Sequence, residues 1–508
     1  MHAEFRNRAA EGALVVVFLV WLVWLPMPFG SVIERARVPL IAVPLALCAL
    51  AALIRMRDEI SSPSLAWRFW TVGSLLFLAF VALQLLPLPL PFLRLVSPQA
   101  ANLWAGSDRV SSLLGTPAAR AHPVSIDPGA TGREWFRLLA LFATFQTAAL
   151  LIRTHLRRIA FAVVLIGAAG FEILYGVNEA ALRRYSIWGW KNTLIFNRVT
   201  GTFVNPNHFA HYLAIIAPVS LFLAAWAWHR AAPGAPFARR VARLIEKNVL
   251  AFGVGVIGAI GCLAAILVAQ SRGALLAVFC GLTIVTTIAM GRTHSFRASR
   301  RRRALFAIGG TLASVVVVVS LVSFLGRERT VKRFVPNEGE TITLIGRTVG
   351  ARIAFGVWKE FPLVGSGAGT FARVSSMAQR DTFDNLFDHA HDDYLEIAAT
   401  TGAAGFAIAV VTLLAGYWSL VRITLGDGAG GSFRRRLFQL AALTSIAVAM
   451  VHALFDFNFF IPANSATLAA IAGAAAAMQI GSFDADATAD RVARHRIREA
   501  HVDSMNPG

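Results

Sequence analysis

Cysteine and acidic residues are scarce in this chain. Only three cysteines occur among 508 residues, and Cys48, Cys262 and Cys280 all fall inside apolar runs. An odd number of cysteines in apolar segments argues against a disulfide framework and against a cysteine-based metal site. Acidic residues number 28 against 48 lysines and arginines, which gives a formal net charge of +20. This imbalance raises the question of an anionic partner.

The distribution of the basic residues argues against nucleic acid as that partner. They lie in the segments between apolar runs, and no soluble domain carries them as a patch. Loops between membrane spans collect lysine and arginine, which contact anionic lipid headgroups. We therefore expect membrane lipids as partners and no nucleic acid.

Long apolar runs recur along the chain, which is 56% hydrophobic with a mean hydropathy of +0.61. Runs of roughly 18–22 residues can cross a bilayer core of about 30 Å. The first run lacks a small-residue cleavage site, so we interpret it as a retained span. The sequence predicts an all-α, polytopic membrane bundle of about twelve transmembrane helices. Their approximate cores are 13–30, 38–54, 69–86, 136–152, 159–177, 207–228, 249–269, 273–290, 304–325, 394–421, 437–456 and 463–480.

The positive-inside rule orients this bundle. Every second loop is short and rich in arginine, which predicts that these loops and both termini are cytoplasmic. The long periplasmic loops would then be about 87–133, 178–206 and 326–393, the last between spans nine and ten. We expect a transmembrane domain over 1–480 and a disordered cytoplasmic tail over 481–508.

The predicted spans contain few ionisable side chains, and Glu172 is the clear exception. A proton- or ion-coupled transporter usually has acids or broken helices near the midplane of the membrane. A twelve-span small-solute transporter is therefore an alternative that the sequence disfavours without excluding it.

Two segments on the predicted periplasmic face suit phosphate. The stretch 197–208 places Arg198 beside a predicted helix start, with Asn207 as its N-cap. The tight link 270–273 places Arg272 between two spans, where a guanidinium can hold two phosphate oxygens. The glycines at 365, 367 and 369 are spaced as in a phosphate loop, but we interpret them as a flexible turn because no Gly-Lys-Ser/Thr follows.

The stretch 389–396 is the strongest candidate for chemistry, because it places histidines and acids directly before an apolar helix. His391 is a candidate general base, with Asp392 or Asp393 orienting it. The alternatives are a surface histidine that caps the helix, or His389 as the base. A metal site formed by these four side chains matches no common zinc spacing. His452 and Asp456 close a later span and would form a second polar wall of the same cleft, or simply a capped helix exit.

Together these segments resemble the O-antigen ligase and polysaccharide polymerase superfamily of bacterial inner membranes. The resemblance covers about residues 120–470 and rests on the order, spacing and common membrane side of loose motifs. The matching stretches are Arg198–Asn207, Ser271–Gly273, Gly346–Arg347 with Trp358 and Pro362–Gly367, His391–Glu396, His452 with Asp456 and Pro462–Asn464, and Ser125–Thr131.

The resemblance implies a metal-independent glycosyltransferase of the inner membrane, with no cofactor and a periplasmic active site. Its donor would be an undecaprenyl-diphosphate-linked glycan, moved en bloc to an acceptor hydroxyl. Arg198 and Arg272 would bind the diphosphate with help from Arg347, and His391 would act as base. One departure is Asp392, where the family often has Asn or Ser.

Two activities within this superfamily remain open. A ligase would pass finished glycan to lipid A-core, whereas a polymerase of O-antigen or exopolysaccharide would pass a growing chain to a lipid-linked repeat unit. We expect the ligase type. A membrane subunit without chemistry is a weaker alternative.

Overall fold

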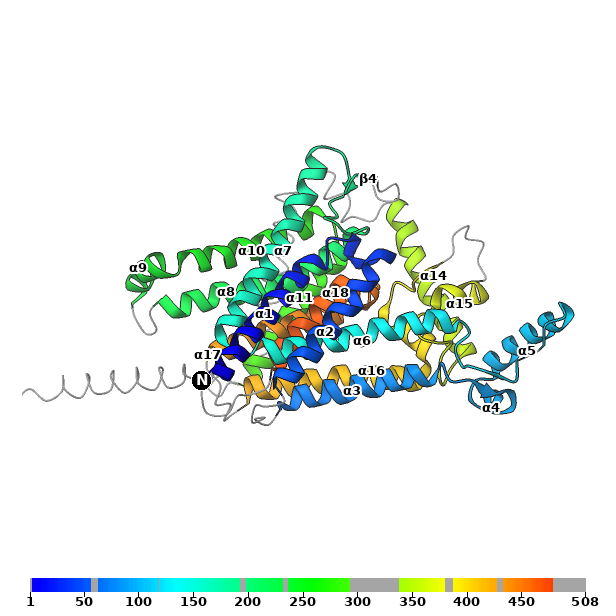
Figure 1. The fold of residues 1–508 in the computed structure, drawn as a ribbon. Helices are drawn as coiled ribbons and strands as arrows, with labels where there is room; N and C mark the ends of the chain where they lie inside the picture. Colours follow the sequence, from blue (N-terminus) through cyan, green and yellow to red (C-terminus); the bar gives the residue numbers. More distant parts are fainter. Residues whose placement is uncertain are drawn as a thin grey trace, which may run out of the picture.

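The computed structural model describes residues 2–55, 63–117, 119–191, 198–231, 236–292, 338–379, 387–426 and 433–477. Most of the described chain is helical, and its few strand residues form two short two-stranded sheets, which confirms the predicted all-α class (Figure 1). The long helices are α1 (His2–Trp24), α2 (Arg37–Arg55), α3 (Leu65–Leu83), α6 (Pro128–Leu151), α7 (His155–Ala181), α8 (Pro206–Ala231), α10 (Val249–Val268), α11 (Arg272–Arg292), α14 (Glu338–Glu360), α16 (Asp393–Leu425), α17 (Phe433–His452) and α18 (Pro462–Ala476).

Seven helices of the described residues are long and apolar enough to cross a membrane, which makes this a multi-pass membrane protein. Eleven of the twelve predicted spans coincide with a helix, and the predicted span 304–325 lies outside the described residues, as does the predicted tail 481–508. The total of twelve therefore stays a prediction. The first helix ends at Trp24, earlier than expected, because Pro26 and Pro28 follow and proline cannot continue a helix.

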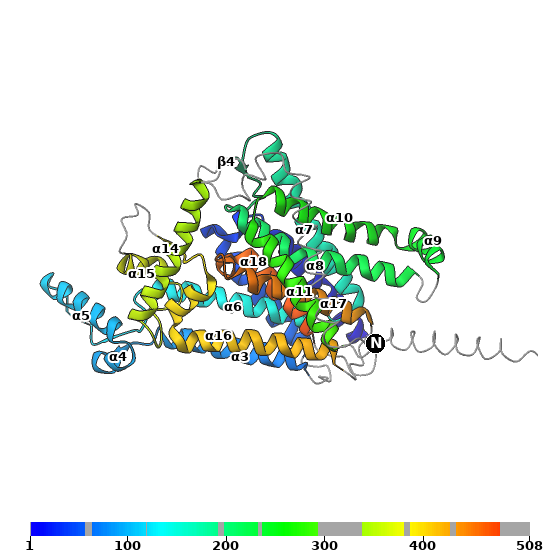
Figure 2. The ribbon, with the colours of Figure 1, turned by 180° about the vertical axis from the view of Figure 1, so that it is seen from behind.

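Helix α8 forms the centre of the bundle. In its most apolar window 89% of the residues are buried, against 44% or less in the other six candidate spans. It packs against α7, α10 and α17. Around it, α3 pairs with α16 and α6 with α18, as both views of the ribbon show (Figures 1 and 2). A central helix with this degree of burial keeps its polar side chains away from lipid.

Short elements gather at one end of the bundle, which we call the loop end (Figure 2). They surround a second apolar core that includes Leu93, Val124, Ile353 and Phe371. The predicted long loop 326–393 is therefore largely helical where the structure describes it. The elements of the loop end are β1 (Leu88–Pro89), α4 (Leu90–Val96), α5 (Pro98–Leu113), β2 (Ala121–His122), α15 (Phe371–Ala378) and most of α14. A separate hairpin consists of β3 (Ser186–Ile187) and β4 (Trp190–Lys191).

The glycine-rich turn at 365–369 is a packed joint and not a flexible turn. Gly365 has a φ of +74°, and a Cβ there would lie 2.2 Å from the carbonyl of Thr400. The amide of Gly367 donates to the carbonyl oxygen of Thr400, and Ile126 donates to the carbonyl of Ser366. The turn thus holds the segments Ser125–Thr131 and Pro362–Gly367 against α16. This packing explains its glycines without a phosphate ligand.

Candidate active site

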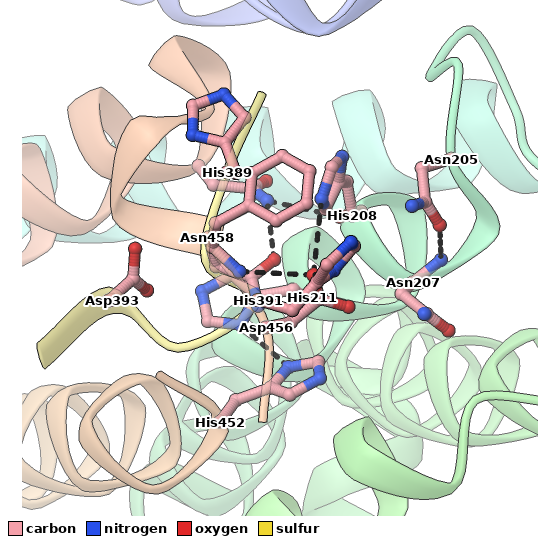
Figure 3. A network of polar contacts seen from close by, with 12 residues as sticks. Asn205, Asn207, His208, His211, His389, His391, Asp393, His452, Asp456 and Asn458 are labelled. Carbon is pink, nitrogen blue, oxygen red and sulfur yellow. Dashed lines mark hydrogen bonds and ion pairs between the residues drawn. The ribbon is translucent and has the colours of Figure 1, made fainter. Parts of the chain in front are cut away.

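A buried carboxylate, Asp456, lies at the centre of a polar cluster at the loop end (Figure 3). Its Oδ1 lies 3.6 Å from Nδ1 of His391 and 3.7 Å from Nε2 of His208. Its Oδ2 lies 3.6 Å from Nη2 of Arg347. These separations are ion-pair distances, slightly too long for hydrogen bonds. Three groups from α8, α14 and the segment before α16 therefore converge on one carboxylate.

The charge state of Asp456 follows from these neighbours. Burial raises the pKa of a carboxyl, but the contacts with His208, His391 and Arg347 outweigh burial and hold the pKa of Asp456 well below its ordinary value. The backbone N–H of Phe457 also donates to Oδ1 at 3.0 Å. Asp456 is therefore an anion at neutral pH, facing a histidine that is one-third exposed.

The segment that carries His391 is fixed at both sides. Asp392 caps α16 by accepting from the backbone N–H of Leu395 at 3.0 Å, and burial raises its pKa. Glu396 accepts from the backbone N–H of Ala390 and lies 2.8 Å from Nδ1 of His389. His391 itself has a φ of +55°, a region that non-glycine residues seldom adopt. A strained backbone held by its neighbours is a common property of functional sites.

The acids next to His391 in sequence have other partners than predicted. Asp392 is the helix cap, and Asp393 accepts from the backbone N–H of Phe459 at 3.1 and 3.2 Å. The carboxylate that faces His391 is Asp456, because the backbone N–H of Asp393 donates to Ala453 and ties α16 to the end of α17. The histidine and its carboxylate thus come from segments 65 residues apart.

An aromatic ring separates the histidines of the cluster. Phe457 stacks on His389 at 4.2 Å between ring centroids, and its edge contacts His208 at 4.6 Å and His391 at 5.0 Å. Glu396 raises the pKa of His389 against the opposing effect of burial. His389, the alternative candidate for the base, therefore contacts Glu396 and Phe457, whereas His391 faces Asp456.

The predicted supporting residue His452 belongs to a second, deeper pair. Its Nδ1 lies 2.9 Å from Nδ1 of His211, and both imidazoles are almost fully buried. A Cβ on Gly273 would lie 2.9 Å from Nε2 of His452. His452 therefore packs directly against the first turn of α11, next to Arg272.

Two of the three predicted diphosphate-binding arginines, Arg198 and Arg272, lie at the link between α10 and α11. Nε and Nη2 of Arg198 donate to the carbonyl of Ala269 at 3.0 and 2.7 Å, and Nη2 also donates to the carbonyl of Gln270 at 3.2 Å. Arg272 is the first residue of α11, two residues further on. Arg198 thus closes the end of α10 and fixes the turn that carries Arg272.

The helix start after Arg198 differs from the prediction in its cap. Helix α8 begins at Pro206, and the N-cap is Asn205, whose Oδ1 accepts from the backbone N–H of Asn207 at 2.8 Å. Proline is well suited to the first helical position, so the helix starts before His208. Asn207 instead accepts from Nη2 of Arg198 at 3.3 Å. Its role is therefore to hold the arginine and not to cap the helix.

Glu172, on α7, anchors the segment between Arg198 and the start of α8. Its carboxylate accepts from the backbone N–H of Thr202 at 2.7 Å and from the hydroxyl of Thr202 at 2.8 Å. The hydroxyl also lies 2.7 Å from the carbonyl of Pro26. Glu172, the acid of the predicted span 159–177, is therefore a structural anchor for the segment of Arg198.

The structure therefore brings His391, Arg347 and Asp456 together, with His452 beside them and Arg198 and Arg272 at the neighbouring link. Sequence reasoning missed His208 and His211. Their spacing of three residues at a helix start places both on one face, which is the signal that could have found them. Nε2 of His208 and Oδ2 of Asp456 make no hydrogen bond among the described residues, so the cluster has capacity for a polar ligand.

An apolar cavity is lined by Phe459 and Phe460, which follow Phe457 closely in the chain. Its volume is about 310 Å³, and it runs between α3, α6, α16, α17 and α18. Phe459 and Phe460 form one wall, and the ion pair of Glu134 and Arg137 lies at its edge. Arg137 also donates to the carbonyl of Phe459 at 2.9 Å. The cavity and the polar cluster thus share one wall.

The class of protein follows from the fold and from a comparison with protein families. Residues 257–410 match the family model described as O-antigen ligase. This match supports the resemblance of the chain to the superfamily of glycan-transferring ligases and polymerases. The matched region contains Arg272, Arg347 and His391, whereas Arg198 and Asp456 lie outside it. No curated protein matches the chain.

Proposed function

We propose that this protein moves glycan en bloc from an undecaprenyl-diphosphate carrier to an acceptor hydroxyl, as an O-antigen ligase does. It would work at the periplasmic face of the bacterial inner membrane. The observation that carries the proposal is the convergence of His391 and Arg347 on the buried Asp456, inside and beside the region that matches the O-antigen ligase family model. Both the base and the cationic groups that the reaction needs lie in this cluster or at the link next to it.

The base would be His391. Its Nδ1 faces Asp456, which favours the tautomer with a proton on Nδ1 and leaves the Nε2 lone pair for the acceptor hydroxyl. As the hydroxyl oxygen attacks the anomeric carbon, its proton passes to Nε2, and the bond from that carbon to the diphosphate oxygen breaks. Asp456 stabilises the imidazolium that forms. The one-third exposure of His391 leaves it accessible to an acceptor.

The arginines would stabilise the leaving group. The diphosphate gains negative charge as its bond to the sugar breaks, and preorganised cations stabilise that charge more than the ground state. Arg272 would bind diphosphate oxygens, and Arg198 would contribute both its charge and the geometry of the link that carries Arg272. Arg347 would assist from α14, where Asp456 already orients it.

The apolar cavity suits a lipid-linked donor. Isoprenoid units are purely apolar, so their transfer from water or an open membrane groove into a close-fitting apolar cavity lowers their free energy. The walls include Phe77, Phe142 and Phe145 along its length, with Phe459 towards the polar cluster. We assign it to part of the donor tail, with the diphosphate held beyond the segment that carries Phe457.

A genetic test separates the activities. The gene would be removed from its native cell and restored as wild type or His391→Ala, and lipopolysaccharide and lipid-linked glycan would be compared on gels. Long glycan that accumulates on the carrier while the lipopolysaccharide ladder disappears indicates a ligase. Single repeat units on either carrier indicate a polymerase. Unchanged lipopolysaccharide and unchanged lipid-linked glycan would contradict both.

A further inference from the structure

A short helix, α9 (Phe237–Lys247), connects α8 to α10 at the end of the bundle opposite the loop end (Figure 1). Both neighbours are candidate membrane spans, and α10 begins two residues after α9 ends. Because α8 and α10 leave and enter the membrane at this face, α9 is held at the depth where the bilayer meets water. This placement does not depend on the function proposed above.

The sequence of α9 divides it into two faces. Phe237, Val241 and Ile245 recur at intervals of four and form an apolar stripe, with Leu244 beside it. Arg239, Arg243 and Lys247 recur at the same interval on the opposite side. Arg240 is a fourth cation, and Glu246 is the only acid in the helix. A helix with this division and this charge is typical of one that lies in a membrane interface.

Among the residues that the structure describes, only one edge of the apolar stripe is covered by the protein itself. Leu244 is buried, and the ring of Phe237 lies 5.8 Å from that of Trp228 on α8. The guanidinium of Arg240 lies 5.5 Å above the Trp228 ring. Phe237 is nevertheless 74% exposed and Ile245 62% exposed. The packing fixes the orientation of α9 and leaves an apolar strip facing outward beside lipid-facing positions of α10.

We propose that α9 is a docking surface for anionic phospholipid in the leaflet at this face. Its outward apolar strip enters the boundary of the acyl chains, and Arg239, Arg243 and Lys247 bind headgroup phosphates. The charge of the helix selects the lipid, because zwitterionic headgroups offer no net negative charge and each basic residue near an anionic surface adds to the attraction. The apolar strip supplies binding that salt does not screen.

The test measures lipid selection by the whole purified protein. Wild type would be incorporated into nanodiscs of equal parts phosphatidylglycerol and phosphatidylcholine. The protein would then be released into the gas phase, and the lipids that it retains would be counted by native mass spectrometry. We expect several-fold enrichment of phosphatidylglycerol over phosphatidylcholine. The variant Arg239→Gln/Arg243→Gln/Lys247→Gln should lose most of that enrichment, because its helix keeps the apolar strip and loses the cations.

A control carries the same charge change elsewhere. Arg109→Gln/Arg120→Gln/Arg373→Gln removes three exposed cations at the loop end and should retain the enrichment of wild type. A second readout places a spin label at Ile245→Cys and at Arg243→Cys in a cysteine-free background. The label at 245 should be shielded from a water-soluble relaxation agent, and that at 243 should be accessible. Equal enrichment in all three proteins, or a fully accessible label at 245, would overturn the proposal.

Discussion

Replacing Asp456 by asparagine should slow glycan transfer by about thirtyfold without preventing folding. The carboxylate lies 3.6 Å from Nδ1 of His391, on which positive charge develops when that residue takes the acceptor proton. Two unit charges about 4 Å apart interact by about 4 kcal/mol at an effective dielectric constant near 20. One-third exposure of His391 admits screening that reduces this to about 2 kcal/mol, which corresponds to a factor of about 30 in rate.

The assay measures initial rates of transfer by purified Asp456→Asn protein, with Asp392→Asn as the comparison. Asparagine is as good an N-cap as aspartate, so Asp392→Asn should lose much less activity if Asp392 acts only as the cap of α16. A wild-type rate in Asp456→Asn would refute the assignment of Asp456 as the partner of His391. A larger loss in Asp392→Asn would restore the neighbouring carboxylate to that role.

The same substitution has a consequence for stability at low pH. The folded-state pKa of Asp456 lies below its unfolded value, so its contribution to stability is present above about pH 4 and is lost as pH falls through the folded pKa. The melting temperature of wild type in detergent should therefore fall more steeply below about pH 4 than that of Asp456→Asn. Parallel curves would show that Asp456 is not held as an anion by its neighbours.

Three further predictions concern the groups around this centre. Arg272→Ala and Arg272→Lys should both abolish transfer while membrane insertion is retained. The lysine variant should fail because a single ammonium does not reproduce a bidentate guanidinium. Wild-type activity of the lysine variant in the transfer assay would exclude the diphosphate role of Arg272. Glu172→Ala should lower stability by about 1–3 kcal/mol, since it removes the acceptor of the buried Thr202 backbone N–H, whereas the hydroxyl still has the carbonyl of Pro26 as an acceptor. Thr202→Val should cost less because its backbone donor keeps its partner; equal losses in thermal unfolding would contradict this. Gly365→Ala should prevent stable folding, because Gly365 has a positive φ and the added Cβ would clash with the Thr400 carbonyl. The control Gly106→Ala should fold, because no atom lies within 4 Å of the added Cβ. An unchanged melting temperature of Gly365→Ala would show that the turn at 365–369 is not tightly packed.

The sequence predicts the parts of this protein that depend on local pattern. Run length and hydropathy place eleven predicted spans on helices, because an apolar segment of that length satisfies its backbone only as a helix. The segment of His391 is also evident locally, since acids and histidines beside an apolar helix are unusual. The proximity of Arg198 to Arg272 joins segments that are far apart in the sequence. Local pattern therefore does not predict it, and only the family resemblance implies it.

The contacts that define the site are long-range and are absent from local pattern. Asp456 faces His391 because a backbone hydrogen bond joins Asp393 to Ala453, and nothing in either segment encodes that pairing. For the same reason the sequence predicts one of the adjacent acids, Asp392 or Asp393, as the partner. The burial of Gly365 against Thr400 also depends on tertiary packing, so its spacing alone suggested a flexible turn.

The most direct test of the central claim is transfer by the purified protein in liposomes. The reaction would contain an undecaprenyl-diphosphate-linked glycan, lipid A-core acceptor and a chelator, with no nucleotide sugar. We predict that wild type forms the glycan–acceptor product and releases undecaprenyl diphosphate, and that folded His391→Ala forms neither. Product formation by His391→Ala at the wild-type rate would contradict the account, as would the absence of product with wild type on both lipid A-core and lipid-linked acceptors.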